Sequence, residues 1–185
     1  MSFSFITQMS KQKKNNKLNN IIKDLTSSED KKVFTALKQL RKHGKKEAIG
    51  PLVDLLSTTK NEEIKSQIIN LLFDLKDQSV VEEIINAIEN EKYKSERATL
   101  ISIFWQSSLD SSEYISIIVK QAIIGDYLIG IEVLSVIDNY DSTFQEAEIE
   151  DLKFDLDEAI ETEETEKINL LTSIRLAIDG LNLEF

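Results

Sequence analysis

Apolar residues recur in this chain with a period close to 32 residues, and this periodicity constrains the fold more than any other feature. One series of equivalent positions is spaced by 32, 32 and 33 residues: Leu40, Leu72, Phe104 and Ile137. A second series has nearly the same spacing: Leu52, Ile84 and Ile117. Each period holds two stretches with helical apolar spacing. Since one helical hairpin cannot bury its own apolar side, the pattern predicts hairpins stacked on one another.

We therefore predict an all-α fold, a right-handed α-solenoid of about four stacked helical hairpins, with no sheet. Residues 17–185 form one domain in this prediction, and residues 1–16 precede it as a flexible basic arm. The expected hairpins and the last single helix have the following bounds: 28–58, 61–91, 94–124, 126–161 and 164–180. The expected core consists of apolar residues from both helices of the hairpins: Leu37, Leu40, Leu52, Leu56, Ile68, Leu72, Ile84, Ile88, Leu100, Phe104, Ile117, Leu134 and Ile137.

Glycine and proline are scarce, which agrees with helices joined by short polar links. The chain has five glycines and one proline in 185 residues, too few for the tight turns of a strand-rich fold. The single proline lies in "KKEAIGPLVDLL", where Pro51 fits the first turn of a helix because the first backbone N–H groups of a helix lack internal partners. Gly130 is expected to let two helices approach closely.

Side-chain caps are expected at several helix starts. Ser79 with Glu82, and Thr143 with Glu146, have the spacing of capping boxes. Aspartates also recur in the links between helices, and we interpret them as structural: Asp77, Asp110 and Asp141.

The segment "EAIGPLVDLL" resembles the second helix of a HEAT-like repeat, of the short bacterial kind also found in phycobilisome-lyase-type proteins. "LKDQSVVEEIINAI" is similar to the link and second helix of that family, with Asp77 at its linking aspartate. Lys65 and Arg97 match a basic position in the family's first helix. The resemblance implies a scaffold for binding partners and brings no catalytic residues with it.

Several kinds of chemistry are excluded or disfavoured by composition. The chain has no cysteine, so it has no disulfide and no thiolate site. Its single histidine, His43, lies at an expected helix end, and one histidine is too few for an HExxH zinc site. We expect no enzyme activity, no cofactor and no metal. No signal peptide or long apolar run is evident, so we expect a cytoplasmic protein with no membrane partner.

The net charge of −11 is unevenly distributed. Residues 1–60 contain 13 Lys/Arg against 5 Asp/Glu, whereas residues 61–185 contain 9 against 28. Together with the scaffold that the resemblance implies, this charge predicts a non-catalytic protein-interaction scaffold or adaptor that offers an acidic surface to a basic protein or peptide. Candidate partner-binding residues face outward on the second helix of successive hairpins: Glu82, Glu83, Asn86, Glu89, Lys120, Gln121, Glu150 and Asp151.

Two other features have alternative interpretations. Asp151, Asp155 and Glu158 share a helix face that could be solvated, receive a basic partner or hold a divalent cation. Trp105 is expected in the core, with an interface aromatic as its alternative.

Other functions stay open beside the scaffold. The basic N-terminal third could contact nucleic acid, although the acidic remainder would repel phosphate. A lyase-like or chaperone-like role on the same repeats, and self-association, are further alternatives.

Overall fold

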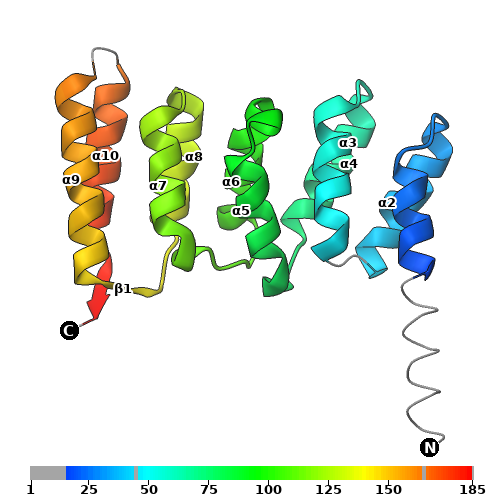
Figure 1. Ribbon diagram of the computed structural model, residues 1–185, viewed down its shortest axis with the longest axis horizontal. Coiled ribbons are helices and arrows are strands. Elements are labelled where there is room, and N and C mark those ends of the chain that lie inside the picture. Colours follow the sequence, from blue (N-terminus) through cyan, green and yellow to red (C-terminus); the bar gives the residue numbers. More distant parts are fainter. Residues whose placement is uncertain (1–15, 44–45, 164–165, 185) are drawn as a thin grey trace, which may run out of the picture. The chain divides into compact units, whose positions relative to one another are not determined.

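The computed structural model describes residues 16–43, 46–163 and 166–184 (Figure 1). Nearly all of the predicted arm at residues 1–16 lies outside this range. The chain divides into two compact units, Met1–Asp74 and Leu75–Phe185. Most described residues are helical, so the all-α class is confirmed.

In its described residues, the first unit consists of helices. Residues 16–25 are helical, and the following elements are α2 (Asp30–His43), η1 (Lys46–Ala48), α3 (Ile49–Thr58) and α4 (Glu62–Phe73). Helix α4 packs on both α2 and α3. Pro51 occupies the first turn of α3, as predicted. The Asn61 side chain caps α4 by accepting from the N–H groups of Glu63 and Ile64.

Among its described residues, the second unit holds six α-helices, three short 3-10 helices and two short strands. Its elements are η2 (Gln78–Val80), α5 (Val81–Glu89), η3 (Glu91–Glu96), α6 (Arg97–Gln106), η4 (Ser112–Tyr114), α7 (Ile115–Ile124), α8 (Tyr127–Ile137), β1 (Thr143–Gln145), α9 (Glu146–Thr162), α10 (Lys167–Asp179) and β2 (Asn182–Glu184). Helix α8 packs between α6 and α10, while α7 packs on α9. Gly130 permits the contact of α8 with α10, since a Cβ there would lie 2.6 Å from Leu170 Cδ2.

Among helices that are consecutive in sequence, α7 with α8 and α9 with α10 pack most closely, and each pair lies side by side in Figure 1. The predicted hairpins at 94–124 and at 126–161 instead paired α6 with α7 and α8 with α9. Link length explains the difference. Only Gly125 and Asp126 separate α7 from α8, and so short a link forces antiparallel neighbours. Asp126 caps α8 by accepting from the N–H of Ile129.

A small sheet contradicts the expectation that no strands form. Strands β1 and β2 pair in parallel, with Phe144 opposite Leu183. Thr143 therefore lies in a strand and does not cap α9, whose first residue is Glu146. Phe144 is buried and makes an edge-on contact with the Tyr140 ring, with centroids 5.5 Å apart. Burial of Phe144 fixes β1 where a helix start was predicted.

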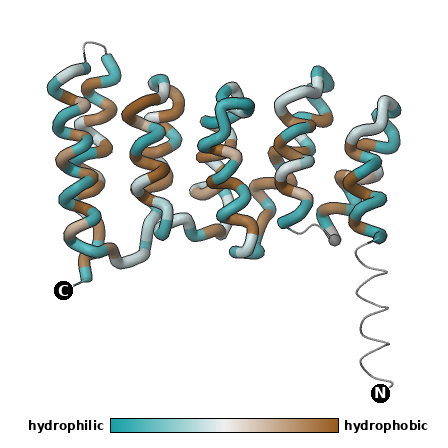
Figure 2. Tube along the Cα trace, in the orientation of Figure 1, coloured by the Kyte–Doolittle hydropathy of each residue, from teal (hydrophilic) through white to brown (hydrophobic). Residues whose placement is uncertain are grey.

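The predicted core is largely confirmed, with two exceptions. Ile117 and Leu134 are only half-buried. Each is one position out of phase with the buried stripe of its helix, which passes through Ile118 in α7 and Val133 in α8. Figure 2 shows hydrophobic residues along much of α7 and α8, whereas hydrophilic residues alternate with them along α9.

Candidate functional site

A groove of about 480 Å³ lies between α7 and α9. Its apolar lining comes from both helices: Val119, Ile123, Ile124 and Leu152. Its polar lining consists of Ser116, Lys120 and the acidic face noted in the sequence, which is Asp151, Asp155 and Glu158. Ile124 remains 58% exposed, so the groove presents apolar surface beside carboxylates.

Helix α9 has two charged flanks, one on each side of its buried stripe of Ile149, Leu152 and Leu156. We call Asp151, Asp155 and Glu158 the groove flank, and Glu150, Lys153 and Asp157 the α10 flank. A helix advances about 100° per residue, which separates residues at these two spacings onto different sides.

The α10 flank is paired with cations. Lys153 Nζ lies 2.9 Å from Glu150 Oε1 and 2.9 Å from Asp179 Oδ1. Arg175 bridges from α10 to Asp157 at 3.1 Å and to Asp179 at 2.7 Å. The hydrogen bond from Lys153, assisted by Arg175, lowers the pKa of Asp179 below its ordinary value. The bonds to Asp179 and Glu150 raise the pKa of Lys153.

The groove flank has no such partners. Among the residues that the structure describes, none of the carboxylates of Asp151, Asp155 and Glu158 forms an ion pair. Lys120 lines the same groove without an ion pair to them. The negative charge of the groove flank is therefore uncompensated and exposed.

The C-terminal end of α7 is held in place by a buried lysine from α10. Lys167 Nζ donates to the carbonyl oxygens of Ile123 and Gly125, at 2.7 Å each. These carbonyls end a helix and favour a cation. Lys167 thereby fixes the groove residues Ile123 and Ile124 even though Ile124 is largely exposed.

The predicted partner-binding residues are divided among different surfaces. Lys120 and Asp151 line the groove, whereas Glu150 belongs to the α10 flank. Gln121 does not face outward as predicted: it is buried, and its Oε1 has no hydrogen-bond partner in the described structure. Gln121 follows exposed Lys120 by one position, and that step of 100° turns it inward.

The predicted residues on α5 lie outside the groove. Glu82, Asn86 and Glu89 are exposed and Glu83 is half-buried. Their role in partner binding stays a prediction.

Two link aspartates, 33 residues apart, each accept a hydrogen bond from the backbone N–H two residues further along the chain. Asp77 accepts from the N–H of Ser79 at 3.1 Å, and Asp110 accepts from the N–H of Ser112 at 2.9 Å. Hydrogen bonding with Ser79, first with its side chain and then with its backbone N–H, lowers the pKa of Asp77. Asp77 thus caps η2, and Ser79 is not the cap that its spacing with Glu82 predicted.

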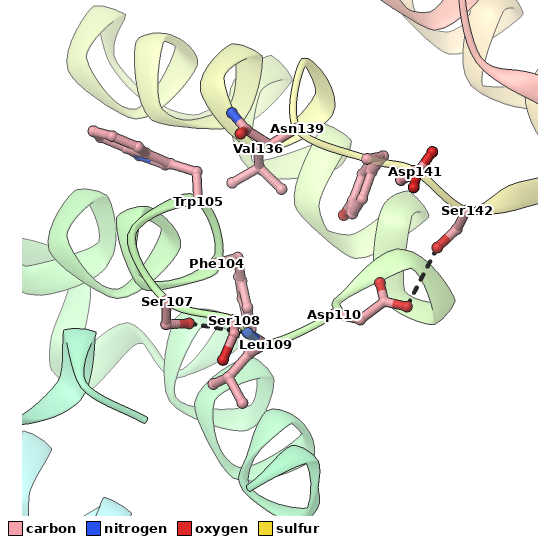
Figure 3. Close-up of a pocket in the computed structure, with 11 residues that line it drawn as sticks. Phe104, Trp105, Ser107, Ser108, Leu109, Asp110, Val136, Asn139, Asp141 and Ser142 are labelled. Carbon is pink, nitrogen blue, oxygen red and sulfur yellow. Dashed lines mark hydrogen bonds between the residues drawn. The ribbon is translucent and has the colours of Figure 1, made fainter. Parts of the chain in front are cut away.

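A second cavity of about 330 Å³ lies at the links that follow α6 and α8 (Figure 3). We call it the loop pocket. It is lined by residues from both links and from the helix ends before them: Phe104, Trp105, Ser107, Ser108, Leu109, Asp110, Val136, Asn139, Tyr140, Asp141 and Ser142. Trp105 is half-buried at its edge and not in the core as expected; its Nε1–H donates to Glu132 at 2.7 Å. Of the residues that line this pocket, the sequence analysis singled out Phe104, Trp105, Asp110 and Asp141.

No group of three or more His, Asp or Glu residues in the described parts of the chain is arranged to hold a metal ion. The described helices are all too short or too polar to cross a membrane.

No family model matches this chain, and no curated protein or solved structure matches it.

Proposed function

We propose that this chain is a non-catalytic interaction scaffold of HEAT-repeat type, and that the groove between α7 and α9 binds a basic amphipathic segment of a partner protein. One observation carries the proposal: the groove flank is uncompensated, while the α10 flank of the same helix is paired. A stacked arrangement of hairpins is part of the proposal, supported by the packing of α6, α8 and α10 in succession.

The lining of the groove defines the chemistry of its partner. Apolar side chains of the partner would cover Ile123, Ile124 and Leu152, and its lysines or arginines would meet the carboxylates of the groove flank. Such a segment is a helix with one apolar face and a basic border, a common ligand of helical grooves. Because the charges are exposed, they contribute mainly to association rate and specificity.

The test uses the full chain and a labelled amphipathic peptide of leucine and lysine, followed by fluorescence anisotropy. The variant Asp151→Lys/Asp155→Lys should weaken binding about tenfold or more at low salt, because it replaces attraction by repulsion. The matched control Glu82→Lys/Glu83→Lys makes the same charge change on α5 and should alter binding by less than about threefold.

Equal losses in both variants would show that the peptide responds only to net charge, which would contradict the groove. A loss confined to the α5 variant would transfer the site to Glu82 and Glu83.

A further inference from the structure

The loop pocket has a lining that selects a cation, and the proposed function makes no use of it. Its volume of about 330 Å³ is near the lower end of the range for ligand sites, so it suits one inserted side chain better than a large cofactor. Figure 3 shows Phe104, Ser108 and Leu109 on one side, facing Val136 and Asn139 at the end of α8 and the Asp110, Asp141 and Ser142 group.

The charged residues in this lining are both carboxylates, and it contains no lysine, arginine or histidine. Asp110 is held rigidly, because Oδ1 accepts from the Ser112 N–H at 2.9 Å and Oδ2 from Ser142 Oγ at 3.3 Å. Asp141 is exposed and has no hydrogen bond or ion pair within the described residues. The pocket therefore offers one fixed and one free carboxylate to a cation.

The electrostatic surroundings of Tyr140 agree with this negative field. Burial raises the pKa of its phenol, a hydrogen bond with Ser111 opposes the rise, and the charges of Asp110 and Glu148 add to it. The phenol stays protonated and bonds to the Ser111 hydroxyl at 3.0 Å, which joins the two links that frame the pocket.

Aromatic side chains complete the lining. Trp105, Tyr140 and Phe104 all border the pocket, and the indole N–H of Trp105 is already bonded to Glu132. A guanidinium group is planar, is weakly hydrated, stacks on aromatic rings and donates to several acceptors at once, whereas an ammonium is a compact, strongly hydrated charge.

We infer that the loop pocket binds the guanidinium group of an arginine residue from a partner protein, with Asp141 as its principal charged acceptor. This site is separate from the groove: its residues and its probe differ, so either can fail alone.

The chain carries its own reporter for the test. Trp105 is the only tryptophan in the sequence and lines the pocket, so its fluorescence reports occupancy in the full chain. The probe is N-acetyl-arginine-N′-methylamide, which mimics an arginine within a chain. The neutral isostere N-acetyl-citrulline-N′-methylamide is the control for shape, and free L-arginine is the control for a metabolite.

We expect a saturable change in Trp105 emission with the arginine derivative and none with the citrulline derivative. Asp141→Asn should weaken binding on the order of tenfold, since it removes a charge-assisted acceptor. Asp138→Asn removes the same charge from an exposed residue just outside the pocket, and should change affinity less than about twofold.

Three results would overturn the inference. The citrulline derivative could bind as well as the arginine derivative, or Asp141→Asn could bind like the unmodified chain, or no saturable change could occur. A clear preference for free arginine would assign the pocket to a metabolite and contradict the protein partner. The citrulline comparison needs no variant, so it remains decisive even if a substitution disturbs folding.

Discussion

The two charged flanks of α9 lie on one helix but differ in their electrostatic environment. On the α10 flank, Lys153 and Arg175 draw Glu150, Asp157 and Asp179 into one network. On the groove flank, Asp151, Asp155 and Glu158 have no cation partner within the described structure. Composition alone cannot show this contrast, because both flanks are rich in carboxylates.

The contrast teaches that a run of acidic residues can serve two purposes. The α10 flank joins two helices, so its charges belong to the fold. The groove flank borders apolar surface, and we propose that its charges meet a partner. We expect substitutions on the α10 flank to change stability and substitutions on the groove flank to change binding.

The largest expected effect is in the core that both flanks share. Leu156 is fully buried in the stripe between them. Leu156→Ala should lower the free energy of unfolding by about 2–5 kcal/mol, because it removes buried methyl groups and leaves a cavity. Urea denaturation measures this loss. An effect below about 1 kcal/mol would show that α9 is not packed as described.

The next effect concerns Lys167, which reaches from α10 to the end of α7. Lys167→Met removes the donor to the carbonyls of Ile123 and Gly125, and should cost about 1.5–3 kcal/mol, as for a hydrogen bond to a charged group. Lys120→Met is the matched control in the groove and should change stability by less than about 0.5 kcal/mol. Similar losses of stability in both variants would contradict the distinction between a charge that holds helices together and a charge that only lines the groove.

A smaller pair of effects should have opposite signs. Arg175→Met removes the bridges to Asp157 and Asp179 and should destabilise the chain by about 0.5–1 kcal/mol. Asp155→Asn relieves repulsion with Asp151 one turn away and should stabilise it by about 0.2–0.5 kcal/mol. Thermal and urea unfolding of both variants measure the signs, and the same sign in both would contradict the account of the two flanks.

The smallest effect is a pH dependence on the α10 flank. The pKa of Asp179 is lower in the folded chain than its ordinary value, chiefly because of Lys153. Its stabilising contribution is therefore complete above the unfolded pKa of about 3.9 and is lost as the pH falls through the folded value. Asp179→Asn should flatten the fall in stability below about pH 4, and Lys153→Met should flatten it to a similar degree. If stability falls with pH in Lys153→Met as it does in the unmodified chain, Lys153 is not the cause of the lowered pKa of Asp179.

Periodicity predicted the helices well because each helix buries an apolar stripe. Leu72 and Ile84, one from each periodic series, are both fully buried. Periodicity could not predict correctly that Ile117 and Leu134 are only half-buried. An apolar stripe that is one residue wider or narrower has the same spacing along the chain. The β1–β2 sheet was missed because three-residue strands carry almost no alternation. The pairing of residues 143–145 with 182–184 is also a contact between distant parts of the chain.

The candidate sites were predictable in part. The shared face of Asp151, Asp155 and Glu158 follows from helix geometry, and these residues do line one groove. Their lack of cation partners depends on where α7 and α10 lie, which no local pattern specifies. The loop pocket joins residues 107–110 to residues 139–142, so only the folded chain brings its carboxylates and aromatic rings together.

Residue-resolved labelling of carboxylates tests the central claim most directly. The full chain is treated with a carbodiimide and glycine ethyl ester, with and without the leucine–lysine peptide, and each labelled site is quantified by mass spectrometry. We predict that Asp151, Asp155 and Glu158 react faster than Asp157 and Asp179 in the free chain, and that the peptide protects only the first three. Equal labelling of both flanks, or equal protection of both, would contradict the division of α9 into a structural flank and a binding flank.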